Sequence, residues 1–272
     1  MMFYDQTTVD SNFVKACCAN LYESDWPRLL LGDSFHPGGL ELTARLGEIM
    51  DLQKEERLLD VASGRGESTL YLAGRFGCEA IGIDYSPKSV KIANVRTAEL
   101  GLDGSVRFEA ADAETLPFAD NSFDALICEC AFCTFPHKER AAAEFARVLK
   151  PGGQIGLSDL TRSGSIPPQL KNLEAWIACI EDALPAMEYV ELLAKAGLKL
   201  RHHEVHDQVL QELAHDIRGK LIGVDLLSKL RKQEIQQFDI STAKSMAKAA
   251  EEAVRTGKLG YALFVAQLVP VT

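Results

Sequence analysis

The feature that most constrains the fold is an alternation of short apolar runs and helical stretches between Arg57 and Ser158. Strands are expected over residues 57–61, 78–84, 106–110, 123–128 and 154–158, and helix-type patterns lie between most of them. One helix is expected to begin at Ser86-Pro87, because serine caps a helix and proline suits its first position. This order predicts an α/β fold, with a doubly wound, mostly parallel sheet and helices on both faces.

The pattern changes beyond residue 160. Helices are expected over residues 170–182, 185–197 and 214–255, and strands over 198–205 and 259–269. No repeat or linker marks a second domain, so the 272 residues are expected to form one domain. Its expected parts are a helical cover (1–55), a cofactor-binding core (56–160) and a substrate side with the last strands (161–272).

Bulk properties exclude several classes of partner. The net charge of -10 argues against binding to nucleic acid or to anionic lipid. No apolar stretch approaches the roughly 20 residues needed to span a bilayer, and residues 1–10 lack the features of a secretory signal. We therefore expect a cytoplasmic protein, in which the seven cysteines form no disulfide framework. The oligomeric state is left open.

A glycine-rich turn follows the first expected strand, in the segment Asp60-Val-Ala-Ser-Gly64-Arg-Gly66. The two glycines allow a tight turn, and the helix that follows offers free N–H groups to a ligand. Asp84 ends the next strand, where a carboxylate can accept both hydroxyls of a ribose. A nicotinamide-binding turn would place a third glycine at Thr69, and Asp60 suits an ammonium group better than a pyrophosphate.

Five segments in this order resemble the motif series of class I S-adenosylmethionine-dependent methyltransferases. They are residues 60–68, 82–84, 111–118, 122–124 and 147–153. The resemblance implies a seven-stranded, Rossmann-like sheet with an antiparallel last strand and S-adenosylmethionine as the cofactor. It implies that Gly64 and Gly66 face the methionine part and that Asp84 holds the ribose. The residues expected at the cofactor are Asp60, Ser63, Gly64, Gly66, Ser68, Asp84, Tyr85, Asp112, Ala113 and Glu129, with Asp112 and Ala113 bordering the adenine and Asp60 at the amino-acid end.

Residues 129–135, which include Cys130 and Cys133, are expected to border the acceptor, because the carboxyl end of the fourth strand faces the ligand in such folds. This segment and residues 178–197 are similar to arsenite methyltransferases, in which cysteines bind the metalloid. The resemblance implies that Cys130 and Cys179 bind trivalent arsenic or a related metalloid, since soft metalloids prefer thiolates. It also implies Cys17 or Cys18 as a third ligand or redox partner, with a thiol reductant as a further partner.

The chain departs from that family at three places. Glu129 replaces an asparagine, residues 29–39 lack a cysteine of the family, and no cysteine follows Gly197. The main alternative is therefore methylation of an oxygen, nitrogen or carbon atom of a small, quinone-like organic metabolite. Glu129 or His36 would then act as a base or an orienting group. A third reading is a non-enzymatic module that binds the cofactor or senses metalloids.

Some of the cysteines are explained by burial in the core, without a chemical role. Cys128 and Cys78 are expected to be structural, whereas Cys130 lies beyond the end of its strand. The cluster of Cys128, Cys130 and Cys133 lacks the paired second half of a zinc or iron–sulfur site, so no metal is expected. The candidate catalytic residues are Cys130, Cys179, Cys18 and Glu129.

Overall fold

A computed structural model describes residues 11–23, 25–32, 34–171, 179–231 and 240–269, to which the structural statements below refer. Its helices are α1 (Ser11–Glu23), α2 (Asp25–Leu31), α3 (Gly39–Ile49), α4 (Glu67–Phe76), α5 (Pro87–Glu99), α6 (Lys138–Val148), α8 (Ala186–Lys195), α9 (Asp207–Arg231) and α10 (Ile240–Arg255), with 3-10 turns η1 (Phe132–Thr134) and η2 (Pro168–Leu170). Its strands are β1 (Arg57–Val61), β2 (Glu79–Asp84), β3 (Val106–Ala110), β4 (Phe123–Glu129), β5 (Leu149–Arg162), β6 (Leu198–Val205) and β7 (Leu259–Leu268). In this part of the chain, no helix has both the length and the apolar character needed to cross a bilayer.

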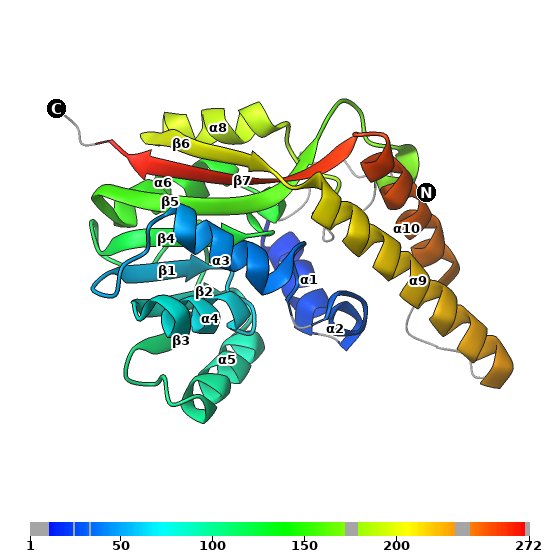
Figure 1. Ribbon diagram of the computed structural model, residues 1–272, viewed down its shortest axis with the longest axis horizontal. Helices are drawn as coiled ribbons and strands as arrows, with labels where there is room; N and C mark the ends of the chain where they lie inside the picture. Colours follow the sequence, from blue (N-terminus) through cyan, green and yellow to red (C-terminus); the bar gives the residue numbers. More distant parts are fainter. Residues whose placement is uncertain (1–10, 24, 33, 172–178, 232–239, 270–272) are drawn as a thin grey trace.

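The strands form one seven-stranded sheet in the order β3-β2-β1-β4-β5-β7-β6 (Figure 1). β3, β2, β1, β4 and β5 are parallel, and β7 lies antiparallel between β5 and β6. The predicted seven-stranded Rossmann-like sheet is confirmed, and its two antiparallel pairings make it a mixed sheet. β1 lies inside the sheet, between β2 and β4, and its Leu58, Leu59 and Val61 have no exposed surface, as expected for a strand covered on both faces.

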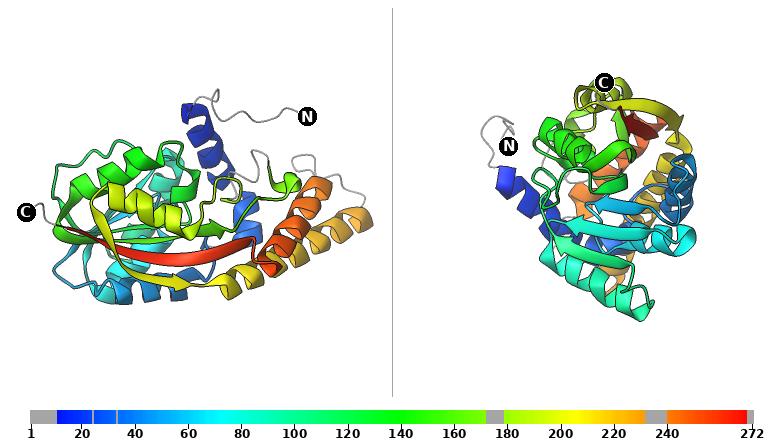
Figure 2. Two further views of the ribbon diagram at one scale, coloured as in Figure 1. Left: turned by 90° about the horizontal axis from the view of Figure 1, so that it is seen from above. Right: turned by 90° about the vertical axis from the view of Figure 1, so that its left-hand side faces the viewer.

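Helices cover both faces of the sheet, with α3 on one face and α6 and α8 on the other (Figure 2). α3 packs closely on β5, where a side chain at Gly156 would meet Leu46 and Met50. The helices leave the carboxyl ends of the parallel strands uncovered. At this end of the sheet, α1 and the loop before α3 form a partial cover (Figure 1).

Three expectations differ from the structure. β5 is longer than predicted because β7 pairs with it as far as Arg162. In the segment expected to be a helix over 170–182, Cys179 lies in a turn, while residues 172–178 fall outside the described chain. α9 and α10 are two packed helices where one helical segment was expected, and residues 232–239 between them are not described (Figure 1).

Candidate active site

A cavity of about 180 Å³ opens at the carboxyl ends of β1, β2 and β4. Of the residues predicted at the cofactor or acceptor, it is lined by Asp60, Ser63, Gly64, Ser68, Asp84, Tyr85, Glu129, Cys130 and Cys18. Gly66, Asp112, Ala113 and Cys179 do not line it. Residues that no cofactor motif indicated complete the wall, among them Lys15, Tyr22, Phe35 and His36.

The glycine turn has the geometry that its sequence requires. Gly64 and Gly66 have φ angles of 55° and 81°, in the left-handed region that favours glycine. A Cβ atom at Gly66 would also lie 2.5 Å from the ring of Phe108. Gly66 therefore acts through the shape of the turn, whereas Gly64 faces the cavity directly.

Asp84 joins this turn to the end of β2. Its carboxylate accepts the backbone N–H of Gly64 at 2.9 Å and that of Ser86 at 2.8 Å. Burial raises the pKa of Asp84, although these hydrogen bonds oppose the shift. Each oxygen keeps a lone pair, so the carboxylate can still accept hydroxyl groups of a ligand.

Asp60, at the end of β1, is only 2% exposed. It accepts a hydrogen bond of 2.5 Å from the hydroxyl of Thr69, the residue that occupies the third-glycine position of a nicotinamide-binding turn. Burial raises the pKa of Asp60 well above its usual value, and the nearby carboxylate of Glu129 adds to the shift. A cationic group entering the cavity would stabilise both carboxylates.

The loop after β3 is covered by a side chain from α1. The ammonium group of Lys15 lies 2.8 Å from Asp112 and 2.6 Å from Glu114, and its side chain is 11% exposed. Burial alone would lower the pKa of Lys15, but the hydrogen bonds with Asp112 and Glu114 raise it. Asp112, which was predicted to border the adenine, therefore forms an ion pair with Lys15 of α1.

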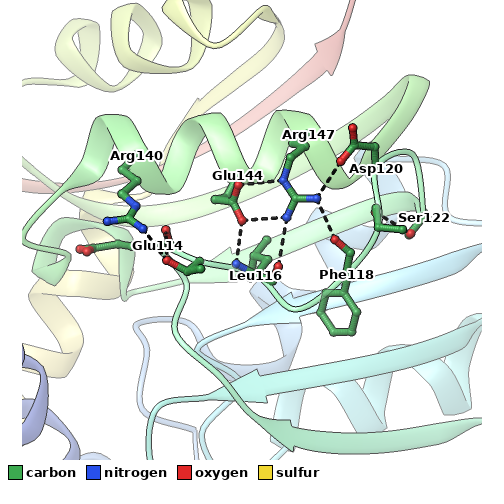
Figure 3. Close-up of polar contacts among 10 residues, drawn as sticks. Glu114, Leu116, Phe118, Asp120, Ser122, Arg140, Glu144 and Arg147 are labelled. Atoms are coloured by element: carbon green, nitrogen blue, oxygen red, sulfur yellow. Dashed lines mark hydrogen bonds and ion pairs between the residues drawn. The ribbon is translucent and has the colours of Figure 1, made fainter.

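The same loop is held from its other side by α6 (Figure 3). Arg147 donates hydrogen bonds to the carbonyl oxygens of Leu116 and Phe118 and pairs with Glu144, which accepts the backbone N–H of Leu116. These hydrogen bonds with Glu144 raise the pKa of Arg147 well above its usual value. Arg147 lies in one of the motifs that carry the family resemblance, and its role here is to fix the loop.

Glu129 belongs to a polar network at the other end of the cavity. The hydroxyl of Thr43 in α3 lies 3.0 Å from its Oε2 and 3.3 Å from Nε2 of His36. Nε2 of His36 also lies 3.4 Å from Oγ of Ser68 and 3.6 Å from Glu129. His36 and Thr43 are 8% and 0% exposed, so this network is buried.

A cluster of thiols lies beside Glu129, where Cys130 reaches the cavity wall. The sulfur atoms of Cys130 and Cys179 and a carboxylate oxygen of Asp159 all lie within 4.8 Å of one another. Hydrogen bonds from Cys130 and from Cys133, with one from Tyr22, lower the pKa of Cys179 well below its usual value. When Cys179 is protonated, its thiol can instead donate to the carbonyl oxygen of Cys130 at 3.1 Å.

The other members of the cluster favour their neutral forms. The pKa of Cys130 is raised because its proton bonds to Cys179, and burial raises that of Cys133. Burial also raises the pKa of Cys18 to about 12 and that of Asp159 to about 7. The cluster can therefore hold one thiolate, at Cys179, with neutral hydrogen-bond donors around it.

The backbone at two of these cysteines is strained. Cys130 and Cys179 have φ angles of 50° and 63°, a region that residues other than glycine rarely adopt. Such conformations cost on the order of 1–3 kcal/mol each and are concentrated at functional sites. The turn at Cys179 brings its sulfur to the end of β4. The expected helix over residues 170–182 did not indicate this position.

Lys15, Tyr22, Thr43 and Asp159 contribute to the site but were not identified from the sequence. They lie on α1, α3 and β5, and none belongs to the motif series. The acid at Asp159 inside the apolar β5 was the one available signal, because an acid in a buried strand needs polar partners.

Comparisons with known proteins agree with this geometry. Residues 59–157 match a family described as methyltransferase domain. Methyltransferase GfsG of Streptomyces halstedii is 29% identical over 185 residues, which cover 66% of this chain and 66% of that protein. The 27-O-demethylrifamycin SV methyltransferase of Amycolatopsis mediterranei is 28% identical over 232 residues, which cover 83% of this chain and 82% of that protein.

A solved structure shares the fold. Phosphoethanolamine N-methyltransferase 2 of Haemonchus contortus, bound to phosphomonomethylethanolamine and S-adenosylhomocysteine, has a TM-score of 0.77 at 19% sequence identity. The match covers 97% of this chain and 61% of that one. The matching domain, the methyltransferase relatives and the cavity at the strand ends agree on S-adenosylmethionine as the cofactor. The chain therefore contains a methyltransferase domain over residues 59–157 and is similar to S-adenosylmethionine-dependent methyltransferases over most of its length.

Proposed function

We propose that the protein transfers the methyl group of S-adenosylmethionine to a soft acceptor held by thiols, namely trivalent arsenic or a related metalloid. The observation that carries this proposal is the convergence of Cys130 and Cys179 beside the donor cavity. Soft metalloids bind thiolates in preference to oxygen ligands. Cys133 is hydrogen-bonded to Cys179, and Cys18 approaches the same cavity on α1.

The donor would lie across the glycine turn. Asp84 would accept the ribose hydroxyls, and the backbone at Gly64 would approach the methionine part. Asp60 and Glu129 would face the donor's ammonium group, whose positive charge offsets the burial of two carboxylates. Cys130, immediately after β4, lines the same cavity, so an acceptor bound there would lie beside the donor.

Binding of the acceptor needs no outside base. Each cysteine that forms a sulfur–arsenic bond displaces a hydroxide from arsenite, and the thiol proton leaves with it as water. Bound S-adenosylmethionine would supply its methyl group to the arsenic lone pair, with the bond electrons staying on the donor sulfur as S-adenosylhomocysteine forms. Arsenic would then be pentavalent, and oxidation of two thiols to a disulfide would return it to the trivalent state. The protein contributes mainly position and exclusion of water, while a thiol reductant keeps the cysteines reduced.

The test is S-adenosylhomocysteine formation with and without arsenite, in the presence of a thiol reductant. We expect turnover that depends on arsenite and that falls by about 100-fold or more in Cys130→Ser. Cys78→Ser is the matched control, because Cys78 is also buried but lies immediately before β2, outside the cavity. Full arsenite turnover by Cys130→Ser and by Cys179→Ser would contradict the proposal.

A second candidate is methylation of a small organic acceptor, which the network around His36 favours. Nδ1 of His36 lies 3.2 Å from the carbonyl oxygen of Pro37, and in the tautomer whose proton is on Nδ1 the Nε2 atom is a hydrogen-bond acceptor. Nε2 could then take a proton from an acceptor hydroxyl or amine, an effect that contributes roughly 100- to 10,000-fold. The names of relatives also point to organic acceptors, such as 27-O-demethylrifamycin SV for the enzyme of Amycolatopsis mediterranei.

The two candidates differ in the residues on which they depend. An organic acceptor would require His36 and tolerate serine at Cys130, whereas a metalloid would show the reverse. His36→Gln should therefore be compared with His203→Gln, a histidine that stacks on Phe264 and does not line the cavity. A panel of small phenols, amines and quinols would serve as acceptors.

A further inference from the structure

We propose that the cluster of Cys130, Cys133, Cys179 and Asp159, which we call the thiol–carboxylate cluster, is a binding site for a soft closed-shell divalent cation such as Zn²⁺. The sequence spacing predicts no metal, because Cys128, Cys130 and Cys133 lack a paired second half. The tertiary structure supplies that half from Cys179 and Asp159. The binding of the cation does not depend on the identity of the methyl acceptor.

The distances are close to those of a tetrahedral site. Zinc binds thiolate sulfur at about 2.3 Å and carboxylate oxygen at about 2.0–2.2 Å, which places neighbouring ligand atoms roughly 3.5–3.8 Å apart. The ligand atoms of Cys130, Cys179 and Asp159 lie within 4.8 Å of one another. A contraction of about 1 Å, achieved by side-chain rotation, would bring them to the metal. Cys133, whose backbone N–H donates to Asp159 at 2.8 Å, lies beside these ligands and is the fourth candidate.

The carboxylate is already oriented by the backbone. Oδ2 of Asp159 accepts the N–H of Cys133 and Oδ1 accepts the N–H of Leu160, both at 2.8 Å. These hydrogen bonds hold the carboxylate in place and leave each oxygen a further lone pair. Outer hydrogen bonds of this kind orient the ligands of metal sites in other proteins.

The charge around the cluster also favours a cation. Asp159 has no exposed surface, and within the described residues no ion pair joins it to a lysine, arginine or histidine. Lys138 is near Cys179, but it pairs with Asp182. A buried acid without a cationic partner is unusual, because its ionised form loses solvation without compensation. A divalent cation would supply that compensation.

Cys130 gives the cation a route from the donor cavity, whose wall it shares with Cys18. A bound cation would occupy the sulfur atoms that we assign to the acceptor. We therefore expect Zn²⁺ to inhibit methylation of arsenite in competition with arsenite, and this consequence rests on the proposed function. Coordination replaces thiol protons, which are released to solvent, so affinity should increase with pH.

The test uses the full-length protein, reduced and freed of metal with a chelator. Zn²⁺ would be titrated against a chromophoric chelator, and Co²⁺ would serve as a spectroscopic substitute whose thiolate charge-transfer band reports sulfur ligands. We expect one equivalent of tightly bound metal with that band. Cys179→Ser and Asp159→Asn should each weaken binding about 10-fold or more, whereas Cys78→Ser should bind as the wild type does.

A surface site must be kept apart from this one. His202 and His206 lie 2.8 Å and 3.1 Å from the carboxylate of Glu204, and imidazoles also bind zinc. His202→Gln should therefore leave the tight site and its sulfur band unchanged. Loss of tight binding in His202→Gln, or unchanged binding in both Cys179→Ser and Asp159→Asn, would overturn the proposal. Binding of S-adenosylhomocysteine by each variant reports that it is folded.

The two proposals fail in different ways. If arsenite is not methylated but Zn²⁺ binds with the expected dependence on Cys179 and Asp159, the proposed acceptor is wrong and the cation site stands. If arsenite is methylated but no tight, cluster-dependent Zn²⁺ binding occurs, the cation site is wrong. If Zn²⁺ binds tightly at the cluster but does not inhibit methylation, the claim that the cation and the acceptor bind the same sulfur atoms is wrong.

Discussion

The donor side and the acceptor side of the cavity are built in different ways. The donor side comes from the ends of β1 and β2 and the turn after β1. There, Asp84 accepts the N–H of Gly64, and Asp60 accepts the hydroxyl of Thr69. The acceptor side combines α1, the end of β4, the middle of β5 and the turn at Cys179. The donor side therefore depends on adjacent strands and backbone groups. The acceptor side depends on side chains that the fold brings together from distant segments.

This difference teaches where substrate identity resides. A glycine turn and a carboxylate at a strand end hold a nucleoside-containing cofactor through groups that many sequences can supply. The acceptor side depends on strained backbone at Cys130 and Cys179 and on one buried acid. The same donor geometry can therefore serve different acceptors when the distant segments change.

The largest expected effect tests whether the two sides are separable. Cys179→Ser should reduce arsenite-dependent turnover by about 1,000-fold, because serine cannot replace a thiolate ligand, a loss of about 4 kcal/mol. The dissociation constant for S-adenosylhomocysteine, measured by calorimetry, should change less than about 3-fold, since Cys179 does not line the cavity. A parallel loss of cofactor affinity would show that the two sides are not separable.

The reciprocal change lies on the donor side. Asp84→Ala should weaken S-adenosylhomocysteine binding by about 100-fold, because two hydrogen bonds to a charged acceptor are lost. Asp103→Ala, an exposed acid in the turn before β3, is the control. Zn²⁺ binding by the thiol–carboxylate cluster should be unchanged in Asp84→Ala, and its loss would indicate a folding defect that spans both sides.

The buried acid gives the acceptor side a pH-dependent stability. Burial raises the pKa of Asp159 to about 7, so above the usual aspartate range the unfolded chain ionises while the native carboxyl keeps its proton. The native state therefore loses stability as pH rises from about 4 to 7, by about 2.6 kcal/mol between pH 5 and 8. The free energy of unfolding of Asp159→Asn, measured with urea, should not show this decrease with pH. If its pH dependence matches that of the wild type, groups other than Asp159 cause the decrease.

The smallest expected effect concerns the helix that joins both sides. Lys15→Met removes the ion pairs with Asp112 and Glu114 and should loosen α1, which carries Cys18 and Tyr22. We expect faster hydrogen exchange in residues 11–23 and a several-fold loss of turnover, since the change leaves Asp112 and Glu114 without their cationic partner. Lys91→Met, at an exposed position of α5, is the control. Unchanged exchange in α1 would show that other contacts hold it.

Much of the core could be predicted because its determinants are local. The apolar runs of β1, β2 and β4 and the glycines at 64 and 66 each specify nearby backbone geometry, and the strand order follows from right-handed crossovers. The position of Asp84 beside the turn is a consequence of β1 and β2 pairing in register. β5 was underestimated because its second half is defined by pairing with β7, which lies about a hundred residues later in the chain.

Short-range pattern was enough to predict the class of fold, the donor motif and the cysteines to consider. It is the folded chain that brings Cys130, Cys133 and Cys179 to Asp159, places Lys15 over Asp112, and links His36 to Glu129 through Thr43. Contacts between distant segments depend on turns such as the one at Cys179 and on how helices dock. No local pattern specifies those features, because many packings satisfy the same periodicity.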